Sequence, residues 1–269
     1  MPKTYETCAV EIEGPVATVT IVAPRTLTGG TSDLHWDLGE VFSDLRGENA
    51  VRVVVLTGSH GEFYKPMPPE FYDRPELRGY VSDPERAWKT FTGVVRTHQA
   101  MAELEKPIVG KVNGDAYGFG SSLAFACDLI YAAEGARFVD IHLGMGEADA
   151  GPRFGIVTGD GGSALVPLFM SPAKAKEYLM LAKEYSGGEL AAMDVINAAY
   201  PAAELDGAVA EVVERLLRRS AYALAWTKRT INRRIADTLN MTLDAAAAYE
   251  MVNFLQLDRL GGEDPLTLG

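Results

Sequence analysis

Short runs of apolar and β-branched residues alternate with longer amphipathic segments over the first two thirds of the chain. The runs at 16–22, 51–56 and 107–112 each end at or near a proline or a glycine, a pattern typical of strands. A further short run at 129–132 has the same character. The nearly unbroken apolar stretch at 51–56 is typical of a strand that is covered on both faces, as in layered α/β proteins.

Helical patterns lie between these strands and dominate the last quarter of the chain. Residues 84–104 predict a helix with Ser82 or Asp83 as its N-cap and Pro84 at its first position. Residues 118–126 are small and apolar, which is compatible with a buried helix.

After residue 201 the strand candidates stop. Three helical patterns follow at 204–219, 221–237 and 242–260. Alternating strands and helices followed by helices alone predict an α/β core over 1–200 and a C-terminal helical region over 201–269.

Composition restricts the class of protein. The 269 residues are 47 % hydrophobic, which is enough for a full core and excludes intrinsic disorder. A formal net charge of −12 makes nucleic acid and anionic membrane surfaces poor partners. The two cysteines, Cys8 and Cys127, have no metal-ligand or disulfide spacing, and no signal peptide or membrane span is evident. We therefore expect a cytoplasmic protein without a metal.

The segment 106–128 (KPIVGKVNGDAYGFGSSLAFACD) is the most informative stretch of the sequence. It combines a strand, a glycine-rich turn and the beginning of an apolar helix. Free backbone N–H groups at such a turn, aided by the helix dipole, can bind an anion or a developing oxyanion. A tight turn whose glycines serve packing alone is an equally good interpretation of the spacing.

This segment, extended to residue 138, resembles the core motif of the crotonase (enoyl-CoA hydratase/isomerase) superfamily. VRVVVLTGSHGEFY at 51–64 and GIVTGDGGSALVPLFMSPAKAKEYLMLA at 155–182 resemble the same superfamily in the right order. The resemblance implies a spiral of ββα turns with a C-terminal helical trimerisation region. It also implies a homotrimer or a dimer of trimers.

The resemblance further implies an oxyanion hole made of two backbone N–H groups, those of Met67 and Phe119. Pro66 and Phe119 stand where the superfamily usually has glycine, yet both donors keep their N–H. The Phe119 ring is expected beside the acyl site, so the substrate is not expected to be held as in an ordinary hydratase.

A hydratase of this superfamily needs two glutamates as acid and base. By position they fall at Ser122 and near His142, and neither residue is glutamate. A serine at its ordinary pKa cannot replace a carboxylate base. Ordinary hydration of an enoyl thioester is therefore not expected.

His142 and Asp160 are the candidate water-activating pair, because a carboxylate beside a histidine fixes its tautomer and stabilises the imidazolium. The alternative is that His142 makes a structural hydrogen bond and that Asp160 caps the helix after Gly161. Of the other histidines, His60 is expected in solvent and His98 at a surface or hydrogen-bonded position.

The pattern GIVTGDG at 155–161, with His35 before an apolar helix and Glu250 in the last helix, resembles the β-diketone hydrolase branch, typified by 6-oxocamphor hydrolase. That branch hydrolyses a C–C bond between two carbonyls without a cofactor. The resemblance assigns His142 and Asp160 to catalysis and His35 and Glu250 to the pocket wall.

Two features depart from that branch. Residues 143–154 contain an insertion, and an earlier gap would put Arg153 in the place of His142. A second histidine near the oxyanion turn is missing, and Tyr117 there could donate a proton or merely pack. We keep Tyr117, Ser122 and Arg153 as candidate substrate-binding residues.

Two other functions stay open. An acyl-CoA hydratase, isomerase or thioesterase with atypical acid/base residues would use Lys228 and Arg229 to contact CoA phosphates, although a solvated basic helix face is the commoner meaning of such residues. A catalytically inactive binding homologue is the third option. The expected partner is a small hydrophobic ketone or an acyl-CoA. A compact ketone is favoured over an acyl-CoA by a group of aromatic and methionine residues near the acyl region: Tyr64, Met67, Phe71, Tyr72 and Phe119.

Overall fold

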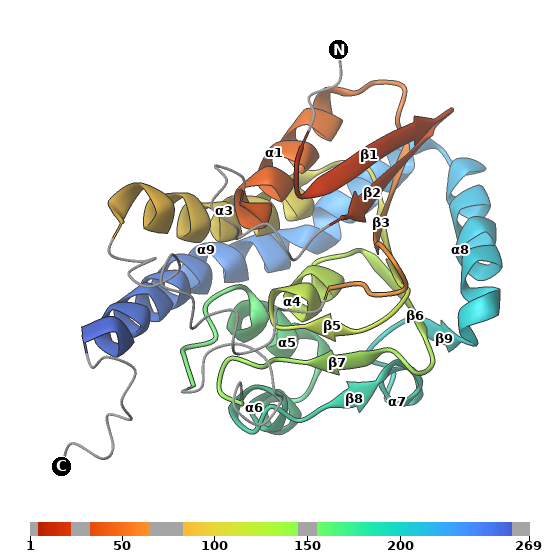
Figure 1. The fold of residues 1–269 in the computed structure, drawn as a ribbon. Helices are drawn as coiled ribbons and strands as arrows, with labels where there is room; N and C mark the ends of the chain where they lie inside the picture. The colour runs from red at the N-terminus through yellow and green to blue at the C-terminus, as the bar shows by residue number, and fades with distance from the viewer. Residues whose placement is uncertain (1–4, 23–32, 65–82, 145–154, 260–269) are drawn as a thin grey trace.

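The computed structural model describes residues 5–22, 33–64, 83–144 and 155–259 (Figure 1). Its strands form a six-stranded sheet, in the order β1-β2-β3-β4-β6-β9, and a three-stranded sheet, in the order β5-β7-β8. The strands of the larger sheet are β1 (Cys8–Glu13), β2 (Val16–Ile21), β3 (Val53–Gly58), β4 (Ile108–Val112), β6 (Leu129–Ala133) and β9 (Ala198–Tyr200). The smaller sheet contains β5 (Ala116–Tyr117), β7 (Arg137–Val139) and β8 (Tyr185–Ser186).

The strands follow the hydrophobic pattern of the sequence. β2 buries every second residue, as an alternating strand does, whereas all six residues of β3 are buried. β1 and β2 form an antiparallel hairpin, and all the other neighbours in the larger sheet are parallel. The strands predicted at 16–22, 51–56, 107–112 and 129–132 are confirmed within two residues at each end.

The chain moves from one sheet to the other in repeated turns. β4 in the larger sheet is followed by β5 in the smaller one, and β6 is followed by β7 in the same way. β5 pairs in parallel with β7, and Tyr64, after β3, makes a parallel bridge to Ala116 of β5. Each turn therefore adds to both sheets, as expected for a ββα spiral.

Helices fill the layers around the two sheets (Figure 1). α3 begins at Pro84, with Asp83 as N-cap accepting bonds from the N–H groups of Glu85 and Arg86, so the prediction for 84–104 is confirmed. α4 confirms the apolar helix predicted at 118–126. The helices between β2 and β9 are α1 (Leu34–Gly47), α3 (Pro84–Glu103), α4 (Phe119–Phe125), α5 (Gly162–Phe169), α6 (Pro172–Met180) and α7 (Gly187–Ala192).

The C-terminal region differs from the prediction. α8 (Ala202–Leu217) is one of the three expected helices, but the other two form a single helix, α9 (Ala221–Arg259). No glycine or proline interrupts 238–241, and Leu239 and Leu243 are buried, so tertiary packing carries the helix through this weakly helical stretch. α9 packs along α3 and also contacts α5.

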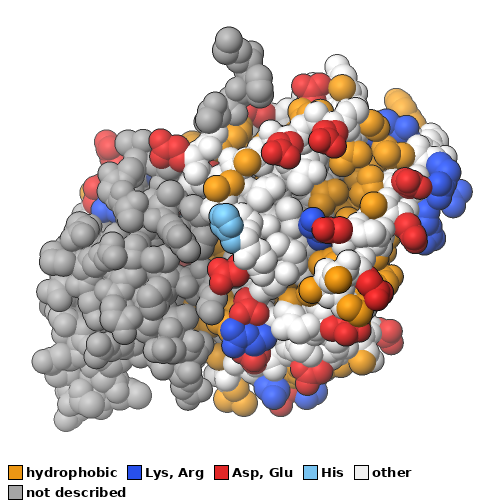
Figure 2. Space-filling view, turned by 45° about the vertical axis from the view of Figure 1, so that its right-hand side comes forward, with side chains coloured by type: hydrophobic (Ala, Val, Ile, Leu, Met, Phe, Trp, Pro, Cys, Tyr) orange, Lys and Arg blue, Asp and Glu red, His pale blue; other side chains and the backbone are white. Residues whose placement is uncertain are grey.

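The surface shows no dominant charge on the side that carries α8. Figure 2 shows acidic and basic side chains interspersed there, with apolar side chains between them and no continuous basic patch. Within the described residues, no helix combines the length and the apolar character that a membrane crossing requires.

Candidate active site

Side chains from three parts of the fold meet at a glycine-rich turn, Gly159-Asp160-Gly161-Gly162. A side chain on Gly159 would collide with Glu250 from α9, and one on Gly162 would collide with Asp140, which follows β7. A side chain on Gly161 would collide with His98 from α3, and the φ of +116° at Gly161 also favours glycine. Three separate elements therefore reach this turn because it has no side chains of its own on either side of Asp160.

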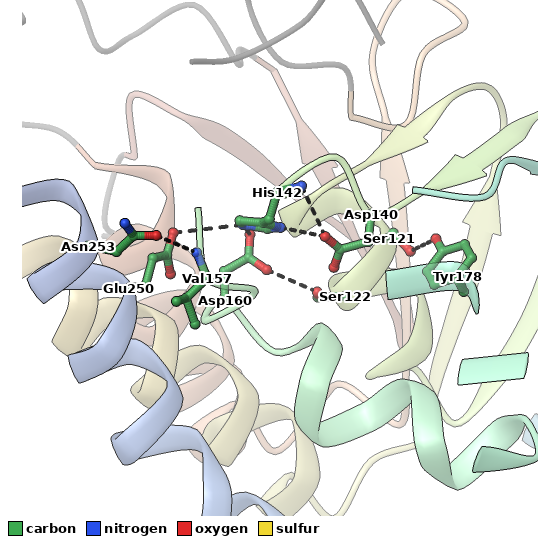
Figure 3. A network of polar contacts seen from close by, with 9 residues as sticks. All are labelled: Ser121, Ser122, Asp140, His142, Val157, Asp160, Tyr178, Glu250 and Asn253. Carbon is green, nitrogen blue, oxygen red and sulfur yellow. Dashed lines mark hydrogen bonds and ion pairs between the residues drawn. The ribbon is translucent and has the colours of Figure 1, made fainter. Parts of the chain in front are cut away.

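His142 lies at the centre of the cluster (Figure 3). Its Nδ1 is 2.6 Å from Oδ1 of Asp140, which also accepts the backbone N–H of His142 at 3.1 Å. On the other side of the ring, Nε2 is 3.2 Å from Oδ2 of Asp160 and 3.7 Å from Oε1 of Glu250. The predicted pairing of His142 with Asp160 is thus present, and Asp140 is a second carboxylate that the sequence analysis missed.

All four side chains are buried. Burial alone would lower the pKa of His142, but the charges of Asp160 and Asp140 raise it well above the usual range. Burial would raise the pKa of Asp160, but the attraction of His142 lowers it. Burial raises the pKa of Glu250 to about 8. These shifts favour a charged His142 beside a charged Asp160, with Glu250 uncharged below about pH 8.

This arrangement changes the expected starting state of His142. A histidine that deprotonates water must be neutral and must offer a free ring nitrogen. Here both nitrogens face carboxylates, which stabilise the charged ring. In its resting state His142 is accordingly a proton donor.

Ser122, at the position where the resemblance expects the first hydratase glutamate, hydrogen-bonds to Asp160. Its hydroxyl donates to Oδ1 of Asp160 at 3.2 Å, from within α4. The neighbouring Ser121 bonds to the hydroxyl of Tyr178 at 2.5 Å (Figure 3). The alternative role of Asp160 as a helix cap is wrong, because Gly161 is the N-cap of α5 and no side chain caps that helix.

Phe119 is the first residue of α4, so its N–H has no acceptor within the helix. Gly118, which has a φ of +52°, donates its own N–H to the carbonyl of Val139 at 2.8 Å. No hydrogen bond engages the Phe119 N–H among the residues that the structure describes. The donor expected for an oxyanion is therefore free, whereas its predicted partner Met67 lies outside the described residues.

The Phe119 ring lies between two histidines. Its centroid is 4.3 Å from that of His35 and 5.8 Å from that of His98. His35, in the first turn of α1, hydrogen-bonds through Nδ1 to Oδ1 of Asp33 at 2.8 Å. Burial would lower the pKa of His35, but Asp33 raises it above its usual value. His35 and Glu250 thus both lie in the region expected of them.

Tyr117 and Arg153, two further candidates for substrate binding, have different outcomes. The Tyr117 hydroxyl reaches Oε2 of Glu184 at 3.5 Å, and its ring packs with Val139 and Ile141, so the packing interpretation is favoured. Arg153 lies outside the described residues.

Lys228 is not available to bind a CoA phosphate. It is buried, and its Nζ is 2.7 Å from Oδ2 of Asp128. The same Nζ donates to the backbone carbonyls of Met101 and Lys106. The expectation for Lys228 is therefore wrong, since the apparent basic face of the helix turns inward at this residue. Arg229 is exposed, with its guanidinium 3.9 Å from Glu105.

Two further expectations concern the remaining histidines. His60 is exposed in the turn after β3, as predicted. The prediction that His98 lies at the surface or has all its polar atoms bonded is wrong. The residue is 1 % exposed. Of its two ring nitrogens, only Nδ1, 2.9 Å from the carbonyl of Val94, has a partner among the described residues.

The sequence contained a signal for part of what was missed. Asp33-Leu-His35 and Asp140-Ile-His142 share the spacing Asp-X-His, and in both the aspartate binds the N–H and the Nδ1 of the histidine. Asn253, by contrast, has no such signal. Its Oδ1 accepts the N–H of Val157 at 3.0 Å and ties the 155–160 segment to α9.

Asp140, His142 and Asp160 also offer ligand atoms within 4.8 Å of one another, which is compatible with a metal ion. The hydrogen bonds explain the same spacing as two carboxylates around a charged imidazole. Because a metal would need His142 unprotonated at the bound nitrogen, the donor set fits a proton better than a metal.

The two sheets, linked by repeated turns of the chain, and the N–H at the start of α4 that is unpaired among the described residues are the features with which the comparisons can be made. The family model for enoyl-CoA hydratase/isomerase matches residues 11–258, and the chain belongs to this family.

Relatives and solved structures agree on the family. The chain is 28 % identical over 237 residues to a probable peroxisomal enoyl-CoA hydratase of Arabidopsis thaliana, covering 88 % of this chain and 81 % of the relative. An enoyl-CoA hydratase/isomerase structure from Mycobacterium paratuberculosis superposes with a TM-score of 0.79 at 26 % identity, covering 95 % and 96 % of the two chains.

A β-diketone hydrolase from the cyanobacterium Anabaena, solved bound to (S)-3-oxocyclohexyl acetic acid, superposes with a TM-score of 0.78. The two chains are 24 % identical, and the match covers 94 % and 96 % of them. At this identity the likeness shows a shared fold.

Proposed function

We propose that this protein is a cofactor-independent hydrolase that cleaves the C–C bond between the two carbonyls of a 1,3-diketone, in particular a cyclic one. The observation that carries the proposal is the buried His142 between Asp140 and Asp160, in a site whose first hydratase position holds Ser122. Neither position at which the family resemblance expects a hydratase glutamate holds glutamate, and a compact set of proton donors and acceptors surrounds His142.

The first step is attack of water on one carbonyl. The oxyanion that forms is received by the N–H of Phe119, and by that of Met67 as the family resemblance implies. Each such donor contributes about 10² to 10³ in rate, because it is aligned before the charge develops.

The second step is cleavage of the C–C bond. Collapse of the tetrahedral intermediate releases a carboxylic acid and an enolate, with the second carbonyl accepting the electron pair. The enolate carbon then takes a proton from the cluster, where imidazolium His142 and uncharged Glu250 are both donors at neutral pH. The product is a keto acid. The substrate's own carbonyl is the electron sink, so the reaction needs neither a metal nor an organic cofactor.

Acyl-CoA chemistry is the second candidate function, because the family relatives named above include enoyl-CoA hydratases. Two observations weigh against it: Ser122 is bonded to Asp160 and cannot serve as a carboxylate base, and Lys228 is held by Asp128. The cyclic diketone is therefore the preferred substrate class.

We also propose that the protein assembles as a homotrimer or as a dimer of trimers. Support comes from large apolar side chains that α9 leaves exposed: Tyr222, Trp226, Ile231, Met241, Tyr249 and Val252.

A paired assay of the purified protein tests the proposed function. One arm follows the loss of enol absorbance from a panel of cyclic 1,3-diketones, and the other follows hydration of crotonyl-CoA. We expect diketone turnover and no hydration. Hydration with inert diketones would contradict the proposal in favour of acyl-CoA chemistry, and two inactive arms would favour a binding homologue.

A further inference from the structure

The proposed reaction needs a base for water, and the resting His142 does not provide one. Its two ring nitrogens face Asp140 and Asp160, and its ring carries a proton. Asp160 is itself a weak base, since its pKa is lowered by His142. A neutral base with a free lone pair has to come from another element.

His98 on α3 has the geometry of such a base. Its Nδ1 is 2.9 Å from the carbonyl of Val94, and a carbonyl can only accept, so Nδ1 carries the proton. Nε2 then holds a bare lone pair. This atom is buried and has no hydrogen-bond partner among the described residues. A buried acceptor without a partner in a native protein calls for an explanation, and a reacting group is one of them.

The Nε2 side of the His98 ring packs against the turn that carries Asp160. It lies against the backbone of Gly161, directly after Asp160, at a distance that only glycine permits. The His98 ring also meets the Phe119 ring edge to face at an interplanar angle of 73°. The His98 ring thus contacts both Phe119, at the start of α4, and the turn that carries Asp160.

The charges around His98 keep it in the opposite state from His142. Burial lowers the pKa of His98, and His35 from α1 lowers it further when charged. The bond to Val94 and the charge of Asp160, from the turn before α5, oppose this only in part. On α9, Glu250 acts on His142, His35 and Asp160 and is uncharged at neutral pH. A pair of titratable groups whose environments separate their pKa values is a signature of an acid and a base in one site.

We propose that His98 is the general base of this site and that its Nε2 accepts the proton of the attacking water, while the His142 cluster supplies the proton of the leaving enolate. This inference rests on the proposed function. It names the residue that accepts the proton of water and the cluster that donates a proton to the enolate.

The protons balance over one turnover. As the water oxygen bonds to the carbonyl carbon, one of its protons moves to Nε2 of His98, and the hydroxyl stays on the tetrahedral carbon. Breakage of the C–C bond leaves a carboxylic acid and an enolate, and the enolate carbon receives a proton from His142. His98 then holds one proton too many and His142 one too few. Passage of that proton from His98 to His142, with Asp160 acting electrostatically on both, restores the resting state.

The test compares His98→Asn with wild type in the diketone assay. Asparagine can keep the bond to the Val94 carbonyl through its amide nitrogen, but it has no group at the position of Nε2. For wild type we expect kcat/KM to rise with pH below about 6.5, the ordinary pKa of histidine, as His98 loses its proton, and to fall at alkaline pH. In H98N we expect kcat to drop by about 10² to 10⁴-fold and the rise on the acid side to disappear. His60→Asn, at an exposed histidine, is the matched control and should keep the wild-type profile.

The outcomes separate the two proposals. A wild-type protein that cleaves no diketone contradicts the proposed function, and the role of His98 with it. A wild-type protein that cleaves diketones while H98N keeps its rate and its acid limb contradicts the role of His98 alone. If H98N does not fold, ¹⁵N NMR of wild-type histidines decides: a neutral His98 with its proton on Nδ1 at pH 7 is expected, and a charged ring overturns the proposal.

Discussion

The buried ionic cluster around Asp128 and the one around His142 differ in how completely their polar atoms are paired. At one end of β4, Oδ2 of Asp128 accepts the N–H of Ile108 at 2.7 Å and faces Nζ of Lys228 at 2.7 Å, while Asn232 lies beside Oδ1. Around His142, by contrast, Oδ2 of Asp140 and Nε2 of His98 have no partner within the part of the chain that the structure describes.

The difference separates a structural cluster from a chemical one. A buried ion pair whose other polar atoms bond to backbone groups holds elements together, here α9 against the start of β4 and the end of α3. A cluster that holds several carboxylates around one imidazolium, and that buries lone pairs without partners, lowers the stability of the folded protein. A role in the reaction explains why such a cluster is present. We therefore expect changes at the two clusters to affect different measurements.

The largest expected effect is on catalysis, from Asp160→Asn. The change removes the charge that stabilises imidazolium His142 but keeps the size of the side chain, and we expect kcat for a diketone to fall by about 10³ to 10⁴-fold. The midpoint of urea unfolding should fall less than in K228M below, because Asp140 still pairs with His142 when the charge of Asp160 is removed. Unchanged turnover in D160N would remove the His142–Asp160 pair from the mechanism.

The next effect is on stability, from Lys228→Met. This substitution keeps the length of the side chain but leaves Asp128 buried without its cation, and we expect the free energy of unfolding to fall by about 3–5 kcal/mol. Urea titration followed by circular dichroism measures the loss. Below the unfolding transition, kcat should stay near the wild-type value. A K228M protein that is stable but inactive would contradict the comparison, because it would assign the Asp128 cluster to catalysis and not to stability.

A smaller catalytic effect is expected from Glu250→Gln. The pKa of Glu250 is raised to about 8, so the acid form that can supply a proton is present below that pH and is lost as the pH rises through it. Wild-type kcat should therefore decline on the alkaline side, from about pH 8. In E250Q we expect a loss of about 10²-fold and a shift of this decline. A pH–rate profile of E250Q that keeps the wild-type decline would assign it to His142 instead.

The smallest effect is expected from Gly161→Ala. Alanine at a φ of +116° is strained by about 1–2 kcal/mol, and its methyl group must displace His98. We expect a modest fall in the unfolding midpoint together with a loss of activity. Gly207→Ala in α8 is the control, since a methyl group there meets nothing within 4 Å and should leave activity unchanged. A G161A enzyme as active as G207A would show that the position of His98 does not matter.

The fold was predictable from the sequence where local pattern and packing agree. β3 and α3 have clear hydrophobic patterns, and α3 also has the signals Asp83 and Pro84 at its beginning. The continuity of α9 was not predictable in this way. Thr238 and Asn240 are weak helix formers, and the helix continues there because Leu239 and Leu243 are buried and Asn240 bonds to Gln99 of α3.

The candidate site was predictable only in part, for a similar reason. His142 and Asp160 are found by family resemblance, and Asp140 has a local signal in the Asp-X-His spacing that it shares with Asp33. Nothing near His98 in the sequence marks it as a site residue. Its importance depends on Gly161, 63 residues further along the chain, which meets it only when α3 and the turn before α5 are brought together.

The central claim is that this site adds water across a C–C bond, and isotope labelling tests it most directly. Wild-type protein would be incubated with a cyclic 1,3-diketone in H₂¹⁸O, and the product analysed by mass spectrometry. We predict a ring-opened keto acid with one ¹⁸O in its carboxylate, and no such label with D160N. An intact diketone, in a preparation that hydrates crotonyl-CoA, would contradict the account and return the protein to acyl-CoA chemistry.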